Sequence, residues 1–137
     1  MGRREHWEQV YSSKPSERLG WYKPRLQTSL EWIRALGLDR GAPVIDVGGG
    51  ASTLVDDLLD QGYTAITVLD LAEPALDLIK ARLGKRSTDV TWLCGDITEL
   101  ELPGNAFELW HDRAVFHFLT EPEDRERYRE NLCRALR

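Results

Sequence analysis

Three aspartates stand where short apolar runs of the sequence end. Asp46 lies in the run at 43–47, Asp70 follows the run at 65–69, and Asp96 follows the run at 90–94. At the end of the second strand of a nucleotide-binding sheet, a carboxylate accepts hydrogen bonds from ribose hydroxyls, which suits Asp70. After the third strand, Asp96 would accept from an adenine amino group, with Ile97 against the ring; the alternative is that Asp96 caps a turn. Carboxylates at three successive run ends indicate a nucleoside-containing ligand.

A glycine-rich stretch follows the first of these runs. Gly48, Gly49 and Gly50 precede a helical pattern, for which Ser52 is the expected N-cap. Glycine lets the backbone turn sharply and approach a ligand closely. This place, after a parallel strand, is where open α/β sheets bind ligands. The alternative is a tight turn with no ligand, which would not need three consecutive glycines.

The same stretch argues against a dinucleotide. The dinucleotide fingerprint is Gly-x-Gly-x-x-Gly, and Thr53 stands where its third glycine belongs. Asp46 would repel a pyrophosphate, which needs N–H donors and the positive end of a helix. S-adenosylmethionine has no phosphate, and its ammonium and sulfonium are both cationic. We therefore expect S-adenosylmethionine as the cofactor.

Strands and helices must alternate to position these residues. Apolar runs predict strands at 43–47, 65–69, 90–94 and 107–110. Helical spacing predicts helices at 54–59, 73–83 and 123–136, and two more before residue 42, at 5–11 and 26–36. Such alternation is typical of an α/β fold with a parallel sheet and helices on both faces. We divide the chain into an N-terminal helical cap (1–41) and a cofactor-binding domain (42–137).

Composition excludes several kinds of partner. The 137 residues carry a net charge of −5, whereas a nucleic-acid surface needs clustered Lys and Arg. No segment resembles a signal peptide or a membrane span, so no membrane partner is expected. Cys94 and Cys133 have neither metal-binding nor disulfide-framework spacing, which indicates a reducing, cytoplasmic setting and no bound metal.

Taken together, these motifs resemble those of class I S-adenosylmethionine-dependent methyltransferases, which implies a Rossmann-like fold. Residues 44–50 resemble the first motif of that family. Residues 68–71, which include Leu71, resemble its ribose-binding motif, and residues 95–97 resemble its adenine-contacting motif. The sequence is most similar to a small bacterial branch related to the citrate synthase lysine methyltransferase. The features that carry this similarity are residues 6–7, Trp21, Tyr22, the glycine stretch and residues 110–119.

In this family the N-terminal segment covers the cofactor. The resemblance therefore implies that Trp21 and Tyr22 lie near it, where an aromatic face beside a sulfonium or ammonium contributes ~0.5–2 kcal/mol. The alternative is that both rings only pack the N-terminal helices onto the sheet. The family's sheet has seven strands, whereas this sequence stops before the fifth. We therefore expect a chain truncated after strand four, which self-associates through the exposed edge of that strand.

Residues after the fourth strand face the methyl group in this fold, and here they include His111, Asp112 and His117. Methyl transfer from a sulfonium is an in-line displacement, so the enzyme mainly aligns a nucleophile and excludes water. His111 is a candidate general base, and His117 is a second one. Asp112 is a candidate to orient an amine by accepting its proton; alternatively it pairs with Arg113.

We therefore predict methyl transfer to a nucleophile such as an amine on a protein or a small molecule. Two alternatives remain open at this point. One is a truncated, non-catalytic module that binds the cofactor. The other is a nucleotide-dependent oxidoreductase on a similar fold, against which Asp46 and Thr53 both count.

Overall fold

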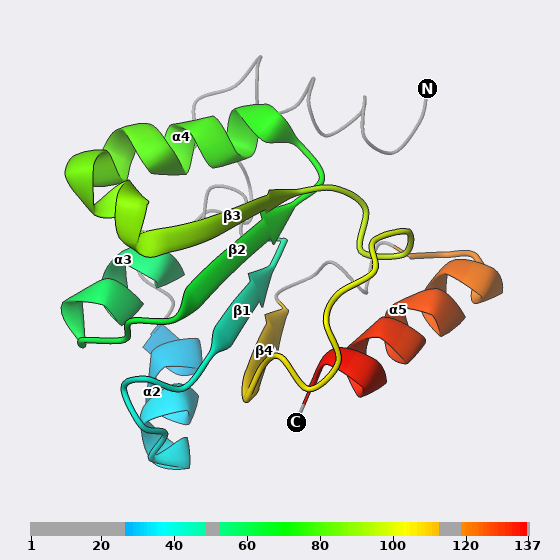
Figure 1. The fold of residues 1–137 in the computed structure, drawn as a ribbon, viewed down its shortest axis with the longest axis horizontal. Coiled ribbons are helices and arrows are strands. Elements are labelled where there is room, and N and C mark those ends of the chain that lie inside the picture. Colours follow the sequence, from blue (N-terminus) through cyan, green and yellow to red (C-terminus); the bar gives the residue numbers. More distant parts are fainter. Residues whose placement is uncertain (1–26, 49–52, 113–118, 137) are drawn as a thin grey trace.

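A single parallel sheet organises the chain. The computed structural model describes residues 27–48, 53–112 and 119–136. Its four strands lie in the order β3-β2-β1-β4, and every pair is parallel (Figure 1). Their bounds are β1 Val44–Val47, β2 Ile66–Asp70, β3 Val90–Cys94 and β4 Leu109–Asp112. The predicted α/β architecture with a parallel sheet is confirmed.

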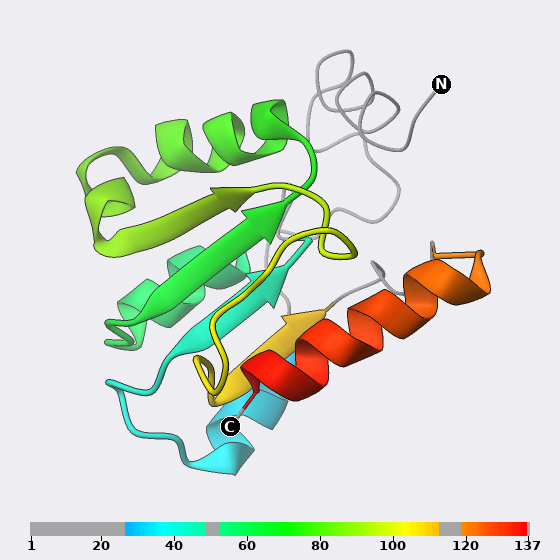
Figure 2. The same ribbon diagram turned by 45° about the vertical axis from the view of Figure 1, so that its right-hand side comes forward.

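Helices cover both faces of this sheet, as Figures 1 and 2 show. Their bounds are α2 Gln27–Leu36, α3 Leu54–Asp60, α4 Glu73–Leu83 and α5 Pro122–Ala135, with a short 3-10 helix, η2, at Gly84–Asp89. Helices α2, α3 and α4 share one hydrophobic core with the sheet, and α5 packs in the other. The prediction of helices on both faces is therefore confirmed.

The first core joins α2 to the sheet. Leu30 and Ile33 of α2 are buried together with Val44 of β1 and Val68 of β2. Residues three apart in a helix lie on one face, so α2 turns this apolar stripe inward. Helix α2 was assigned to the N-terminal cap, and it shares a core with the sheet; the boundary at residues 41 and 42 stays a prediction.

The second core lies on the α5 face. Ile45, Val47 and Leu69 alternate with the residues of the first core along β1 and β2, and they pack with Tyr128 and Ala135 of α5. All positions of β1 and β2 are buried, as parallel strands covered on both faces require. The two central strands, which carry Asp46 and Asp70, are therefore packed on both faces.

Strand four differs from its prediction by two residues. Its predicted bounds were 107–110, whereas β4 runs from Leu109 to Asp112. Phe107 forms only an isolated bridge to Leu136, and its amide donates to the carbonyl of Ala135 at 3.0 Å. The apolar side chain of Phe107 is therefore explained by its burial next to the C-terminal end of α5, and Phe107 is not part of β4. As a consequence His111 and Asp112 lie inside β4, which corrects the expectation that they follow it.

Candidate cofactor site and catalytic edge

The three predicted carboxylates lie at one end of the sheet. Asp46 is the third residue of β1, Asp70 is the last residue of β2, and Asp96 follows β3. Because these strands are parallel neighbours, their carboxyl ends meet at the same edge. Asp46 and Asp70 are both buried. The structure therefore places these three carboxylates at the same end of the sheet.

Gly48 begins the turn after β1 with a backbone that favours glycine. Its φ is +72°, in the left-handed region where a side chain is strained. Its amide donates to the carbonyl of Leu69 at 2.7 Å, so the turn begins while the chain is still bonded to β2. The N-cap of α3 is Thr53 and not Ser52 as predicted, because the helix begins at Leu54, one residue later than a cap at Ser52 requires. Several other predicted site residues lie outside the described residues: Gly49, Gly50, Ser52, Trp21, Tyr22 and His117.

Asp70 is oriented by the chain that follows it. The amide of Ala72 donates to Oδ1 of Asp70 at 2.9 Å. This bond fixes the carboxylate at the start of α4. Leu71, between them, is half-buried, and its carbonyl accepts a weak contact from Sγ of Cys94 at 3.7 Å. Asp70 therefore has a defined orientation at the carboxyl end of β2, as the predicted ribose acceptor needs.

Asp96 stabilises a turn. Its Oδ1 accepts from the amide of Thr98 at 2.9 Å and from the Thr98 hydroxyl at 2.7 Å. This is the turn role weighed as the alternative to adenine binding, and a contact to adenine stays a prediction. Ile97 is buried in the second core, and its carbonyl accepts from the side-chain amide of Asn131.

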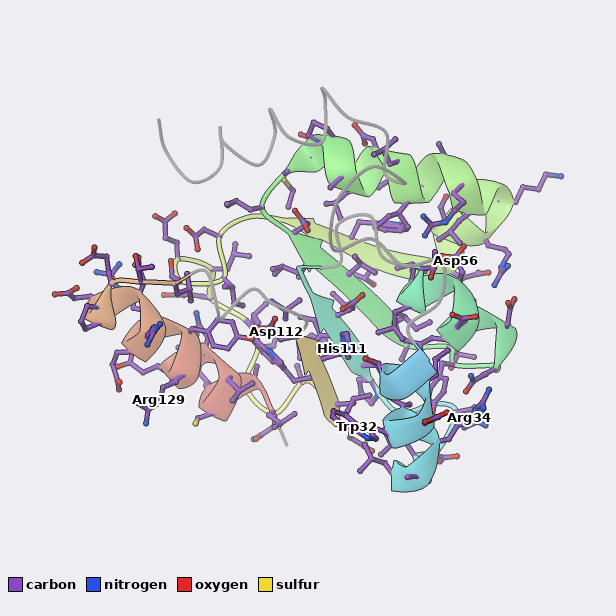
Figure 3. The ribbon with its side chains drawn as sticks, turned by 180° about the vertical axis from the view of Figure 1, so that it is seen from behind. Trp32, Arg34, Asp56, His111, Asp112 and Arg129 are labelled. Atoms are coloured by element: carbon purple, nitrogen blue, oxygen red, sulfur yellow. The ribbon has the colours of Figure 1, made fainter. Side chains whose placement is uncertain are left out.

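His111 and Asp112 point to opposite faces of the sheet, because side chains alternate along a strand. His111 lies across from Asp46 in the register of β1 and β4. Its Nδ1 is 2.9 Å from Oδ1 of Asp46, and its Nε2 is 2.9 Å from Oγ of Ser29 on α2. Figure 3 shows His111 beside α2 and Asp112 toward α5. The two residues therefore face different surroundings, which the sequence alone did not separate.

Asp112 is held by a tyrosine of α5. The Tyr128 hydroxyl donates to Oδ2 of Asp112 and accepts from Nε1 of Trp110 at 2.9 Å. The two rings meet edge to face, with centroids 5.8 Å apart. Burial, followed by the hydrogen bond and the charge of Asp112, raises the pKa of Tyr128 well above its ordinary value. The hydroxyl therefore keeps its proton and stays a donor.

Ser29 and Tyr128 were missed by the sequence analysis. Tyr128 gave a weak signal, since it is the single aromatic residue in the highly charged α5. Ser29 gave none, because its partner His111 lies 82 residues away in the chain.

The described residues fit S-adenosylmethionine. A buried carboxylate in β1 suits a cationic ammonium, and the oriented carboxylate of Asp70 suits ribose hydroxyls. The left-handed backbone of Gly48 permits close approach of a ligand. The family model of the methyltransferase domain matches residues 44–137 of this chain.

The chain belongs to the methyltransferase domain family. This membership confirms the identification as a class I S-adenosylmethionine-dependent methyltransferase with a Rossmann-like fold, and S-adenosylmethionine as the cofactor. The narrower resemblance to the branch of the citrate synthase lysine methyltransferase stays a prediction.

Individual relatives differ in what their names say they methylate. The chain is 28% identical to the eEF1A lysine and N-terminal methyltransferase of Mus musculus over 127 residues, which is 90% of this chain and 18% of that protein. It is 34% identical to the malonyl-[acyl-carrier protein] O-methyltransferase of Anoxybacillus flavithermus over 82 residues, which is 58% of this chain and 30% of that protein. The structure of phosphoethanolamine N-methyltransferase 1 from Haemonchus contortus, in complex with phosphoethanolamine and S-adenosylhomocysteine, has a TM-score of 0.74 at 17% identity. It covers 98% of this chain and 29% of that one, and it shows the shared fold. The chain thus spans less than a third of the length of each of these proteins.

Proposed function

We propose that this chain binds S-adenosylmethionine at the carboxyl ends of β1, β2 and β3 and catalyses methyl transfer to an amine. The observation that carries the proposal is the buried carboxylate of Asp46, two residues before the left-handed Gly48. When bound, S-adenosylmethionine supplies an electrophilic methyl group on its sulfonium. Asp46 accepts from the cofactor's ammonium, Asp70 from its ribose hydroxyls and Asp96 from its adenine amino group.

Asp112 is the residue we propose for contact with the methyl acceptor. It is the last residue of β4 and half-buried, and the Tyr128 hydroxyl holds its carboxylate. A carboxylate attracts a cationic ammonium and accepts its proton before transfer, so an amine on a protein or a small molecule suits this position. An in-line displacement needs that orientation more than it needs a strong base. His111 fits the role of base less well, because both of its ring nitrogens lie within hydrogen-bonding distance of protein oxygens.

Further parts of the sequence-based interpretation remain proposals. In the part of the chain that the structure describes, β4 pairs with β1 along one edge, which is compatible with self-association through the other edge. In the described part of the chain neither Cys94 nor Cys133 forms a disulfide, which is compatible with the proposed reducing, cytoplasmic setting. None of the described helices combines the length and the apolar composition needed to cross a bilayer.

Calorimetry with S-adenosylhomocysteine and NAD tests the binding part of the proposal. We expect the chain to bind S-adenosylhomocysteine and not NAD, because Asp46 would repel a pyrophosphate. Tighter binding of NAD than of S-adenosylhomocysteine would overturn the proposal.

Transfer of a labelled methyl group to a panel of lysine peptides and small amines tests the catalytic part. Asp112→Asn still accepts from Tyr128 but has no negative charge, so we expect turnover to fall at least tenfold with unchanged affinity for S-adenosylhomocysteine. Glu130→Gln, on an exposed position of α5, is the matched control. A chain that binds the cofactor product but methylates nothing in the panel would support the alternative of a non-catalytic binding module.

A further inference from the structure

One network of polar contacts joins α2, β4 and β1. It runs from the hydroxyl of Ser29 on α2, through the ring of His111 on β4, to the carboxylate of Asp46 on β1, and both of its contacts measure 2.9 Å. The side chain of His111 is 12% exposed and that of Asp46 is 4% exposed. These are therefore interior contacts, largely shielded from competing water.

The chemistry of the three groups sets the direction of the hydrogen bonds. An ionised carboxylate only accepts, so Nδ1 of His111 carries a proton and donates to Asp46. In the neutral ring Nε2 then has a lone pair, which accepts from the Ser29 hydroxyl. A partner of the imidazole thus selects its tautomer, as carboxylates do for other functional histidines.

A carboxylate this deeply buried needs partners that hold it in one orientation. His111 supplies an N–H to Oδ1 of Asp46, and Ser29 holds the far side of the ring. Because Leu30 and Ile33 anchor α2 in the first core, Ser29 is attached to a fixed element. A site whose polar groups are already oriented spends less binding free energy on ordering them.

We infer that Ser29 and His111 are positioning residues, through which α2 holds the Asp46 carboxylate in the orientation that receives the cofactor's ammonium. This inference rests on the proposed binding of S-adenosylmethionine at Asp46. It also gives His111 a role other than that of general base. Neither ring nitrogen could take a proton from the methyl acceptor unless His111 first lost its contact with Asp46 or with Ser29.

Two replacements of His111 separate positioning from general stability. An asparagine amide nitrogen takes the place of Nδ1, so His111→Asn keeps the donor to Asp46. A glutamine amide reaches the place of Nε2, so His111→Gln keeps the contact to Ser29 and loses the one to Asp46. We expect affinity for S-adenosylhomocysteine, measured by calorimetry, to change less than threefold in His111→Asn and to fall about tenfold or more in His111→Gln.

Ser29→Ala completes the set, with Arg34→Gln on the exposed side of α2 as its control. We expect a severalfold loss of affinity for Ser29→Ala and none for Arg34→Gln. Thermal unfolding without ligand is measured for each variant, so that a loss of affinity in a folded protein is recognised as such. Equal affinities for the two His111 variants, whether both lost or both retained, would overturn the inference.

Nitrogen NMR of the imidazole ring provides a readout that does not depend on the ligand. We expect the Nδ1–H tautomer in the wild-type chain; the Nε2–H tautomer would overturn the inference. Failure of the wild-type chain to bind S-adenosylhomocysteine would overturn the proposed function and this inference with it. If the wild-type chain binds S-adenosylhomocysteine and His111→Gln binds it with the same affinity, only the positioning role is overturned.

Discussion

Removing the hydroxyl of Tyr128 probes how α5 supports Asp112 at the carboxyl end of β4. The change Tyr128→Phe keeps the ring and its edge-to-face contact with Trp110. It deletes the hydrogen bond donated to Asp112 and the one accepted from Trp110 Nε1. The variant therefore isolates the polar contribution of one atom from the packing of the side chain.

The expected cost follows from the two bonds. A hydrogen bond to a charged group contributes roughly 1.5–3 kcal/mol and one between neutral groups roughly 0.5–1.5 kcal/mol. Asp112 and Trp110 are only half-buried, so water replaces part of what is lost. We expect the free energy of unfolding to fall by about 1–3 kcal/mol.

Urea denaturation measures this change as a lower midpoint with an unchanged slope. Tyr63→Phe is the matched control, because Tyr63 is also buried and its hydroxyl accepts from the exposed Arg40, at 3.2 Å. A double-mutant cycle with Asp112→Ala should recover a coupling of roughly 0.5–3 kcal/mol. A loss for Tyr128→Phe no larger than for Tyr63→Phe, together with zero coupling, would refute the reasoning.

Three more outcomes are expected. Asp70→Ala should weaken binding of S-adenosylhomocysteine tenfold or more, as measured by calorimetry. Asp70→Asn, which still accepts from Ala72, should lose less affinity. Unchanged affinity in folded Asp70→Ala would mean that the residue is only structural. Gly48→Val places a branched residue at φ +72°, at a cost of roughly 1–3 kcal/mol. It should abolish binding of S-adenosylhomocysteine while circular dichroism shows an intact sheet. A variant that does not fold would show that the loop is chiefly a structural turn. Because the pKa of Tyr128 is raised in the folded state, its contribution to stability is complete below its ordinary pKa, near pH 10, and is lost above it at up to ~1.36 kcal/mol per pH unit. Tyr128→Phe should have a shallower alkaline loss, and an identical loss in both proteins would contradict this assignment.

The first three strands and the carboxylates they carry were predictable because their signals are local. The bounds of β3 agree with the prediction, and those of β1 and β2 agree within one residue. Each is a short apolar run that stops at glycine or at an acidic residue. Asp46 was recognised by its place just before the glycine stretch, where it would repel a pyrophosphate. Asp70 was recognised by its place at the end of the second strand, where a carboxylate accepts from ribose hydroxyls.

Strand four and its surroundings were harder to predict because their signals are not local. Phe107 reads as part of a strand, yet it is buried against Leu136. His111 and Asp112 were expected to follow the strand, because the apolar run of the sequence ends at Trp110. The contacts of His111 with Ser29 and of Asp112 with Tyr128 depend on helices placed by tertiary packing, which periodicity does not encode.

The strand order has a consequence for how the chain folds. Asp46 and His111 are neighbours in the sheet but lie 65 residues apart in the chain, whereas Val44 meets its partner in β2, Ile66, much sooner. A loop about three times longer costs about 1 kcal/mol more to close, so β1, β2 and β3 should pair first and β4 should dock late. Asp46 would keep its hydration shell until that step, and the loss of its water would coincide with the arrival of the imidazole. Folding-rate measurements on substitutions in β4 should then give φ-values near zero, with values in β1 and β2 clearly higher.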